Sequence, residues 1–128
     1  RSGVRVRLFI PAKADHLFMS WGARAYLPEL TICGVEVWEM GPGFNHSKLT
    51  VIDDEWIMMG SSNLDPRSFR LNFEFNVEAY SRIVALDITM YMNRQIAGAR
   101  RIDTDTLNQE PRLIQLRNKM VALLSPLL

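Results

Sequence analysis

Residues 46–63 read HSKLTVIDDEWIMMGSSN, and this stretch predicts a β-hairpin. Apolar and polar side chains alternate over residues 47–52, and a second, mainly apolar run covers residues 56–59. Such runs, when turn-forming residues separate them, are typical of paired strands. The turn falls on Asp53 and Asp54, because aspartate is common in tight turns. The hairpin therefore returns the chain, at Gly60, to the place where the first strand begins.

The open end of this hairpin gathers an imidazole, an ammonium, a hydroxyl and an amide. His46 and Lys48 lie two residues apart on a strand, so both side chains point to the same face. The returning strand brings Gly60, Ser61 and Asn63 close to them. Lys48 offers positive charge to phosphate oxygens, Ser61 and Asn63 offer hydrogen bonds, and Gly60 allows the backbone to approach closely. His46 can attack phosphorus or transfer a proton near neutral pH, so the set favours phosphoryl chemistry.

Each of these residues has an ordinary interpretation when it is taken alone. A single histidine on a strand is commonly a surface or core residue, and a single lysine is commonly a solvated charge. The two aspartates alone indicate a turn, and residues 60–63 alone indicate a loop. The functional hypothesis therefore depends on finding all of them at fixed spacing.

Further strands and helices are predicted on both sides of the hairpin. Strands are predicted over 4–10, ending at Pro11, over 35–40 and over 73–80, and helices over 16–30, 84–99 and 111–124. Asp15 is the expected N-cap of the first helix, which Pro28 kinks or restarts, and 103–108 is a polar connection. This order predicts the α/β class, with a mixed β-sheet flanked by helices in a single domain over residues 1–128.

Composition narrows the possible classes of protein. The chain has 128 residues, of which 48% are hydrophobic and 23% charged, as in ordinary globular domains. The net charge of +1 argues against strong nonspecific binding to nucleic acid. Cys33 is the one cysteine, so an internal disulfide and a multi-cysteine zinc site are excluded, and we expect its side chain to be small and buried. No apolar run reaches the roughly 18 residues that a membrane span needs.

The motif and its flanks resemble the phospholipase D superfamily. The pattern His46-x-Lys48-x4-Asp53-x6-Gly60-Ser61-x-Asn63 matches the signature of that superfamily, often called the HKD motif. The flanks are similar to the C-terminal half of bacterial cardiolipin synthases at Gly3-Val4-x-Val6, Pro11, Gly34-Val35-x-Val37, Asn63–Ser68, Asn72-x-Glu74 and Leu124–Leu128. The resemblance therefore extends over nearly the whole chain and implies a phospholipase D-like domain, half of the usual two-domain sandwich.

The resemblance also implies roles for individual residues. His46 is either the nucleophile, which forms a phosphohistidine, or its acid/base partner. Lys48 and Asn63 hold the nonbridging phosphate oxygens with help from Ser61, and Glu74 hydrogen-bonds the histidine's other nitrogen. The implied catalytic set is His46, Lys48, Asp53 and Glu74, with Asp53 expected to brace the hairpin, and the implied phosphate-binding set is Lys48, Ser61 and Asn63. No metal and no other cofactor is expected.

One departure from the family concerns the number of motifs. Cardiolipin synthases carry two, whereas this chain carries one. The missing half is expected either upstream in a longer protein, of which this chain is a C-terminal fragment, or in a second copy of the chain. We favour the fragment, because the sequence opens without methionine on strand-like residues and its flanks are synthase-like.

The implied reaction transfers a phosphatidyl group between two phosphatidylglycerol molecules and releases glycerol. The implied location is the bacterial cytoplasmic membrane, reached through the full-length protein. The segment from Arg82 onward contains seven basic residues (Arg82, Arg94, Arg100, Arg101, Arg112, Arg117 and Lys119) and four acidic ones (Asp87, Asp103, Asp105 and Glu110). With the apolar face of the last helix, this excess favours an anionic membrane surface, although a helix that simply packs on the core would show the same pattern.

Two other functions remain open at this stage. The chain could form a homodimeric phosphodiesterase that acts on nucleic acid, but its near-neutral charge argues against that interpretation, and we expect no nucleic-acid partner. It could also be an inert interaction module. The intact His46, Lys48, Asn63 and Glu74 argue against such decay.

Overall fold

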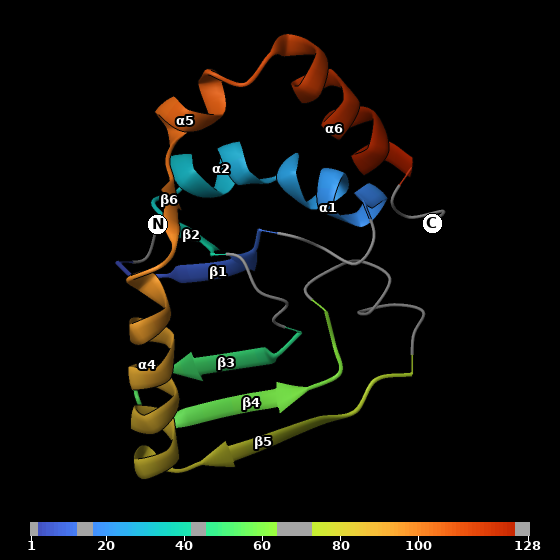
Figure 1. The fold of residues 1–128 in the computed structure, drawn as a ribbon. Coiled ribbons are helices and arrows are strands. Elements are labelled where there is room, and N and C mark those ends of the chain that lie inside the picture. Colours follow the sequence, from blue (N-terminus) through green and yellow to red (C-terminus); the bar gives the residue numbers. More distant parts are fainter. Residues whose placement is uncertain (1–2, 13–16, 42–45, 64–72, 125–128) are drawn as a thin grey trace. The chain divides into compact units, whose positions relative to one another are not determined.

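A computed structural model describes residues 3–12, 17–41, 46–63 and 73–124 of the chain (Figure 1). Helices and strands are interspersed along it, as in the α/β class. The elements are β1 (Arg7–Pro11), α1 (Leu17–Arg24), α2 (Leu27–Ile32), β2 (Glu36–Met40), β3 (Lys48–Ile52), β4 (Trp56–Gly60), β5 (Asn76–Tyr80), α4 (Arg82–Ile96), β6 (Arg100–Ile102), α5 (Thr104–Asn108) and α6 (Arg112–Leu124).

The described strands form two three-stranded sheets, in the orders β1-β2-β6 and β3-β4-β5. The first sheet is mixed and the second is antiparallel, so the predicted α/β class with a mixed β-sheet flanked by helices is confirmed. The strands divide into two sheets because β2 is paired on both sides and has no free side to receive β3. The sheets belong to two compact units, residues 1–44 with 98–128 and residues 45–97. We call them the first and the second unit.

The first unit is built around the central strand β2. β1 runs parallel to β2, and β6 runs antiparallel to its other side. The fully buried Val37 of β2 packs in a core with Leu27, Ile102 and Leu107. α2 begins at Leu27 with Pro28 in its first turn, where a missing N–H is tolerated, so the predicted restart of the helix is confirmed.

A buried carboxylate joins three segments of the first unit. Glu39 of β2 is 8% exposed. Its Oε2 accepts a hydrogen bond from Arg100 Nη2 of β6 at 2.7 Å, and its Oε1 pairs with Arg24 of α1. Arg24 also reaches Glu110 Oε1, at 3.3 Å from Nη1. A charge taken out of water needs such partners, so this network connects strands and helices that lie far apart in the sequence.

The second unit is an antiparallel sheet with one helix packed against it. β3 and β4 form the predicted hairpin, and β5 pairs with the other side of β4 (Figure 1). Asp53 and Asp54 have φ angles of 52° and 53°, the left-handed pair that a tight hairpin turn of this hand requires. α4 packs against β3 and β4, and Ile57 of β4 and Ala85 of α4 are both buried.

Capping and side-chain contacts fix α4 against the hairpin. The Ser81 hydroxyl accepts the Val84 N–H at the helix N-terminus, which replaces one hydrogen bond that the helix itself cannot make. The Thr89 hydroxyl donates to Asp54 Oδ1 at 2.9 Å, so the turn is tied to the middle of the helix. Ser81 N–H also donates to the Glu55 carbonyl at 2.9 Å.

Several predicted boundaries differ from the structure. β1 starts at Arg7 instead of residue 4, β5 starts at Asn76 instead of residue 73, and α4 spans Arg82–Ile96 instead of residues 84–99. β6 was not predicted, and neither was α5, because 103–108 was expected to be a polar connection. Cys33 is exposed, so its predicted burial is wrong. The predicted N-cap Asp15 lies outside the described residues.

Candidate functional site

The strand registers of the second unit explain the spacing of the motif. Lys48 pairs with Gly60, and Gly60 pairs with Asn76, so these three residues form a row across the sheet. His46, Ser62 and Glu74 each lie two residues further along the same three chain segments, beyond the last strand pair. Because side chains two residues apart share a face, the registers bring His46 and Lys48 to the same end of the sheet as Glu74.

Lys48 and His46 are in direct contact at this end. Lys48 Nζ lies 2.8 Å from His46 Nδ1 and 2.9 Å from His46 Nε2. The same ammonium donates to the His46 carbonyl oxygen at 2.9 Å. His46 is exposed and Lys48 is half-buried, so a ligand can reach the imidazole while the strand fixes the lysine stem. A cation and an imidazole are thus held together without burial.

Ser61 holds Glu74. The Ser61 hydroxyl donates to Glu74 Oε2 at 2.5 Å and accepts the Phe75 N–H at 3.0 Å. Ser61 N–H donates to the Phe75 carbonyl at 3.0 Å, so the β4 and β5 segments stay paired one residue beyond Gly60. The prediction that Ser61 binds phosphate therefore meets a competing contact, because its one hydroxyl proton is directed to a carboxylate.

Asn76 is a site residue that the sequence reasoning did not assign. Its Nδ2 donates to Ser62 Oγ at 2.7 Å, and its Oδ1 lies 3.5 Å from Ser62 N. A Cβ at Gly60 would overlap both Asn76 Oδ1 and the Phe75 carbonyl oxygen, so only glycine fits. Asn76 therefore holds the segment that follows β4 from the side of β5. Its period-two spacing from Glu74 was the available signal.

The structure does not bring every predicted site residue together. Asp53 lies in the turn at the opposite end of β3 from Lys48, five residues away, which is about 16 Å along an extended strand. Asp53 therefore belongs to the turn and is separated from Lys48 and His46. Asn63 follows Ser62 on the segment after β4, three residues beyond Gly60, and is half-buried.

This arrangement suits a reaction at a phosphate. An imidazole can supply a nucleophile or a proton, and the adjacent ammonium can neutralise an anionic oxygen. The carboxylate of Glu74 is held in place by the hydroxyl of Ser61, which lies on the neighbouring segment. Among residues 3–12, 17–41, 46–63 and 73–124, no three His, Cys, Asp or Glu side chains gather in a way that could hold a metal ion.

Comparison with known proteins gives consistent matches. Residues 1–96 match a family described as "Cardiolipin synthase, PLD-like domain". The chain is 35% identical over 127 residues to the "Major cardiolipin synthase ClsA" of Bacillus subtilis (strain 168). It is 34% identical over 128 residues to "Cardiolipin synthase 1" of Staphylococcus aureus (strain COL), and 36% identical over 126 residues to "Cardiolipin synthase A" of Pseudomonas putida (strain GB-1).

These alignments include nearly all of this chain but a small part of each relative. They cover 98–100% of the chain and 26% of each of the three relatives. The chain therefore spans about a quarter of the length of the proteins it matches. No solved structure matches it.

Proposed function

We propose, since the chain belongs to the cardiolipin synthase family of phospholipase D-like domains, that it supplies one of two half-sites of a phosphatidyltransferase. The proposed reaction joins two phosphatidylglycerol molecules into cardiolipin and releases glycerol. The single observation that carries this proposal is the contact between Lys48 and His46 at the sheet end that also holds the Ser61–Glu74 pair. The relatives named as cardiolipin synthases support the choice of reaction.

The reaction runs through a phosphohistidine in two balanced steps. In the first, an imidazole nitrogen attacks phosphorus, the P–O bond to glycerol breaks, and a second histidine gives its proton to the departing glycerol oxygen. In the second, the hydroxyl of another phosphatidylglycerol attacks phosphorus and passes its proton to that second histidine, and the P–N bond breaks. His46 is one of these two histidines, and the half that completes the site supplies the other.

The remaining residues serve the phosphate and the imidazole. Lys48 and Asn63 hold the nonbridging oxygens. When the phosphate binds, the Lys48 ammonium leaves the His46 ring and pairs with these negatively charged oxygens. Glu74 supports the imidazolium as carboxylates do in other His–carboxylate pairs, and Ser61 fixes Glu74. Asp53 stabilises the hairpin from its turn.

The half that completes the site is proposed to lie in the same longer protein. One histidine cannot be nucleophile and simultaneous general acid, so a second motif is required. The longer protein is proposed to act at the bacterial cytoplasmic membrane, where its lipid substrates reside. No described helix of this chain is both long enough and apolar enough to cross a bilayer.

Light scattering, combined with a transfer assay on phosphatidylglycerol vesicles, tests the proposal. We expect the 128-residue chain alone to be monomeric and inactive, and the complete two-motif protein to be active. In that protein, His46→Ala and Lys48→Ala should each lower transfer at least about a thousandfold, because each removes a group that acts on the reacting phosphate. An acid-labile phosphatidyl group on His46, found by mass spectrometry, would identify it as the nucleophile.

Thr50→Ala provides the matched control. Thr50 is exposed and lies on β3 two residues after Lys48, so it shares the strand and face but has no proposed role. Its replacement should leave transfer unchanged. A folded His46→Ala protein with full activity would disprove the proposed role. An active dimer of the 128-residue chain would instead mean that two His46 side chains complete one site.

A further inference from the structure

An exposed apolar stripe runs along α6. Its members are the large apolar side chains of this helix that are more than half exposed: Leu113, Leu116, Met120, Leu123 and Leu124. Leu113 is 81% exposed and Leu123 is 80% exposed. At about 100° per residue the five lie within a sector of roughly 100°, so they form one continuous face. We call this face the α6 stripe.

A different face of α6 attaches the helix to its own unit. Asn118 and Val121 are buried, and α6 packs against α1. Gly22 of α1 lies close to this contact, since a Cβ added to this glycine would stand 3.7 Å from Val121 Cγ1. The buried contact of α6 is thus made by this other face, while the α6 stripe stays exposed.

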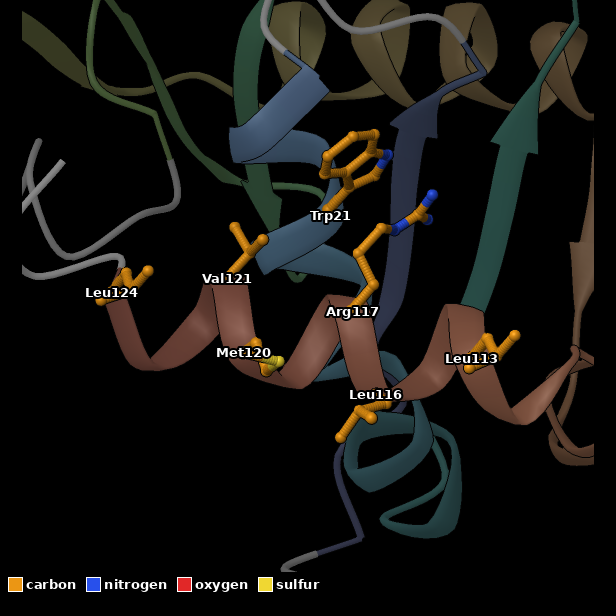
Figure 2. Close-up of a pocket in the computed structure, with 7 residues that line it drawn as sticks. All are labelled: Trp21, Leu113, Leu116, Arg117, Met120, Val121 and Leu124. Carbon is orange, nitrogen blue, oxygen red and sulfur yellow. The ribbon is translucent and has the colours of Figure 1, made fainter.

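A shallow apolar groove continues the α6 stripe toward α1 (Figure 2). It has a volume of about 390 Å³, and its lining includes four stripe residues together with Trp21 and Arg117. The Arg117 guanidinium lies over the Trp21 ring at 4.1 Å from the ring centroid (Figure 2). An indole beside a guanidinium is a pairing that suits the boundary between lipid tails and water.

Cations border the α6 stripe on both sides. On the same helical projection, Arg112 and Lys119 follow one edge of the stripe and Arg117 follows the other. Residues 112–124 contain no aspartate or glutamate. The nearest acid before the helix is Glu110, which is paired with Arg24. The helix therefore presents an apolar strip with a wholly cationic border.

We propose that α6 lies in the headgroup region of an anionic phospholipid bilayer, with the α6 stripe among the acyl chains and the three cations at the phosphates. Long basic side chains reach back to the headgroups from such a position. A protein partner fits less well, because three cations with no acid among them match a densely anionic surface, which phospholipid headgroups supply. The proposal extends the proposed function and rests on it for the anionic phospholipid as the class of lipid.

Vesicle co-sedimentation of the 128-residue chain tests the role of the stripe. Vesicles of phosphatidylcholine with 30 mol% phosphatidylglycerol should bind the chain, and pure phosphatidylcholine vesicles should bind it much less. The triple variant Leu113→Gln, Leu116→Gln, Leu123→Gln should bind at least about tenfold more weakly, because the buried apolar area is lost.

A second triple variant makes a matched control. Ile32→Gln, Ile52→Gln and Ile83→Gln remove three apolar side chains of comparable exposure (61%, 50% and 78%) that lie outside α6. This variant should bind as the unaltered chain does. Circular dichroism of both variants checks that the fold is retained.

The cationic border is tested separately. Arg112→Gln with Lys119→Gln should weaken binding about fivefold for each lost cation at low salt, and the difference should shrink as salt is added. Arg82→Gln with Arg94→Gln on α4 removes the same charge elsewhere and should have little effect. Equal losses in the two pairs would mean that only net charge matters, which would overturn the assignment to α6.

Three further outcomes would also overturn the proposal. They are a failure of the unaltered chain to bind anionic vesicles, unchanged binding of the α6 triple variant, and self-association of the chain that this variant abolishes. The last outcome would assign the stripe to a contact between copies. Transfer by the two-motif protein on detergent-dispersed phosphatidylglycerol separates this proposal from the proposed function, because the α6 variant should retain that activity and His46→Ala should lose it.

Discussion

Ser61 and Glu74 form the shortest described contact at the candidate site, at 2.5 Å, and it makes the serine a positioning residue for the carboxylate. Ser61→Ala should lower kcat for transfer about 10- to 100-fold, as is common when a group that orients a reacting side chain is lost. KM should stay unchanged, because the phosphate contacts remain. Ser61→Thr, which keeps the hydroxyl, should restore most of the rate.

Glu74→Gln provides the comparison for this prediction. Glutamine keeps an oxygen that can accept the Ser61 hydroxyl but carries no charge to support an imidazolium. Glu74→Gln should lower kcat as well, and this decrease should be smaller than the decrease caused by His46→Ala. A rise in KM without a change in kcat for Ser61→Ala would show instead that the hydroxyl binds the phosphate.

Gly60 is restricted by its neighbours across the sheet. Gly60→Ala should lower the free energy of unfolding by about 1–3 kcal/mol, because the new Cβ overlaps Asn76 and the Phe75 carbonyl and pushes β4 away from β5. Urea unfolding measures this change. Gly98→Ala is the control, since no heavy atom lies within 4 Å of a Cβ there, and it should change stability little. Equal stability of the two variants would contradict the close approach.

Individual site residues were predictable where their chemistry is distinctive. His46 and Lys48 were identified from residue type and spacing, and Glu74 from the family resemblance, and the registers bring their segments to one end of the sheet. Asn76 was missed because an asparagine on an exposed strand has many ordinary explanations, and its contact with Ser62 depends on pairing between β4 and β5. Sequence alone also did not show that the Ser61 hydroxyl is directed to Glu74.

Short elements escaped sequence reasoning, whereas longer ones did not. The hairpin and the helices α4 and α6 have enough residues for a period to be recognised. β6 has three residues and α5 has five, which is less than the window that such patterns need. β6 exists as a strand because it pairs with β2, and that pairing is a tertiary contact.

Asp103 gives α5 a pH-dependent start. Its carboxylate accepts the Thr106 hydroxyl at 2.7 Å and the Thr106 N–H at 2.8 Å. These hydrogen bonds hold the pKa of Asp103 below its ordinary value, and the bond from the Thr106 hydroxyl has the largest effect. A lowered folded-state pKa means that the stabilisation is fully present above the ordinary aspartate pKa of about 3.9 and is lost as pH falls through the lowered value.

An NMR titration of the carboxyl carbons tests this prediction. The Asp103 signal should titrate with a midpoint below the ordinary aspartate pKa of about 3.9, and the Thr106 amide signal should move with the same midpoint. Asp103→Asn keeps an oxygen that can cap the helix, so α5 should persist while this pH dependence disappears. A Thr106 amide that responds to pH equally in the variant would contradict the assignment.

At the scale of the whole chain, the α/β class was predictable but the division into two sheets was not. Order along the sequence does not specify which strands become neighbours, and β2 is enclosed by β1 and β6. The family resemblance, carried by the motif and its flanks, was the more specific signal, and the match over residues 1–96 confirms it. The exposed α6 stripe could not be foreseen, because an apolar helical face predicts burial and does not say against what.

The Glu39 network is the clearest stabilising contact between distant segments of the first unit. Arg24→Met should lower the free energy of unfolding by up to about 3 kcal/mol, because a buried carboxylate loses one of its two cations. Glu39→Gln should cost less, about 1 kcal/mol, since an amide oxygen can still accept from an arginine. Urea unfolding of the two variants measures both values, and a larger loss for Glu39→Gln would contradict this account.

The same network constrains the order in which descendants of this chain can change. If Glu39 is replaced first, Arg24 keeps its ion pair with Glu110, and the largely exposed Arg100 can be solvated by water. Both arginines can then be lost later, one at a time. If an arginine is replaced first, the lineage must carry an under-partnered buried acid until a second mutation arrives. Across diverging relatives we therefore expect arginines without the acid to be a common intermediate, and the acid without its arginines to be a rare one.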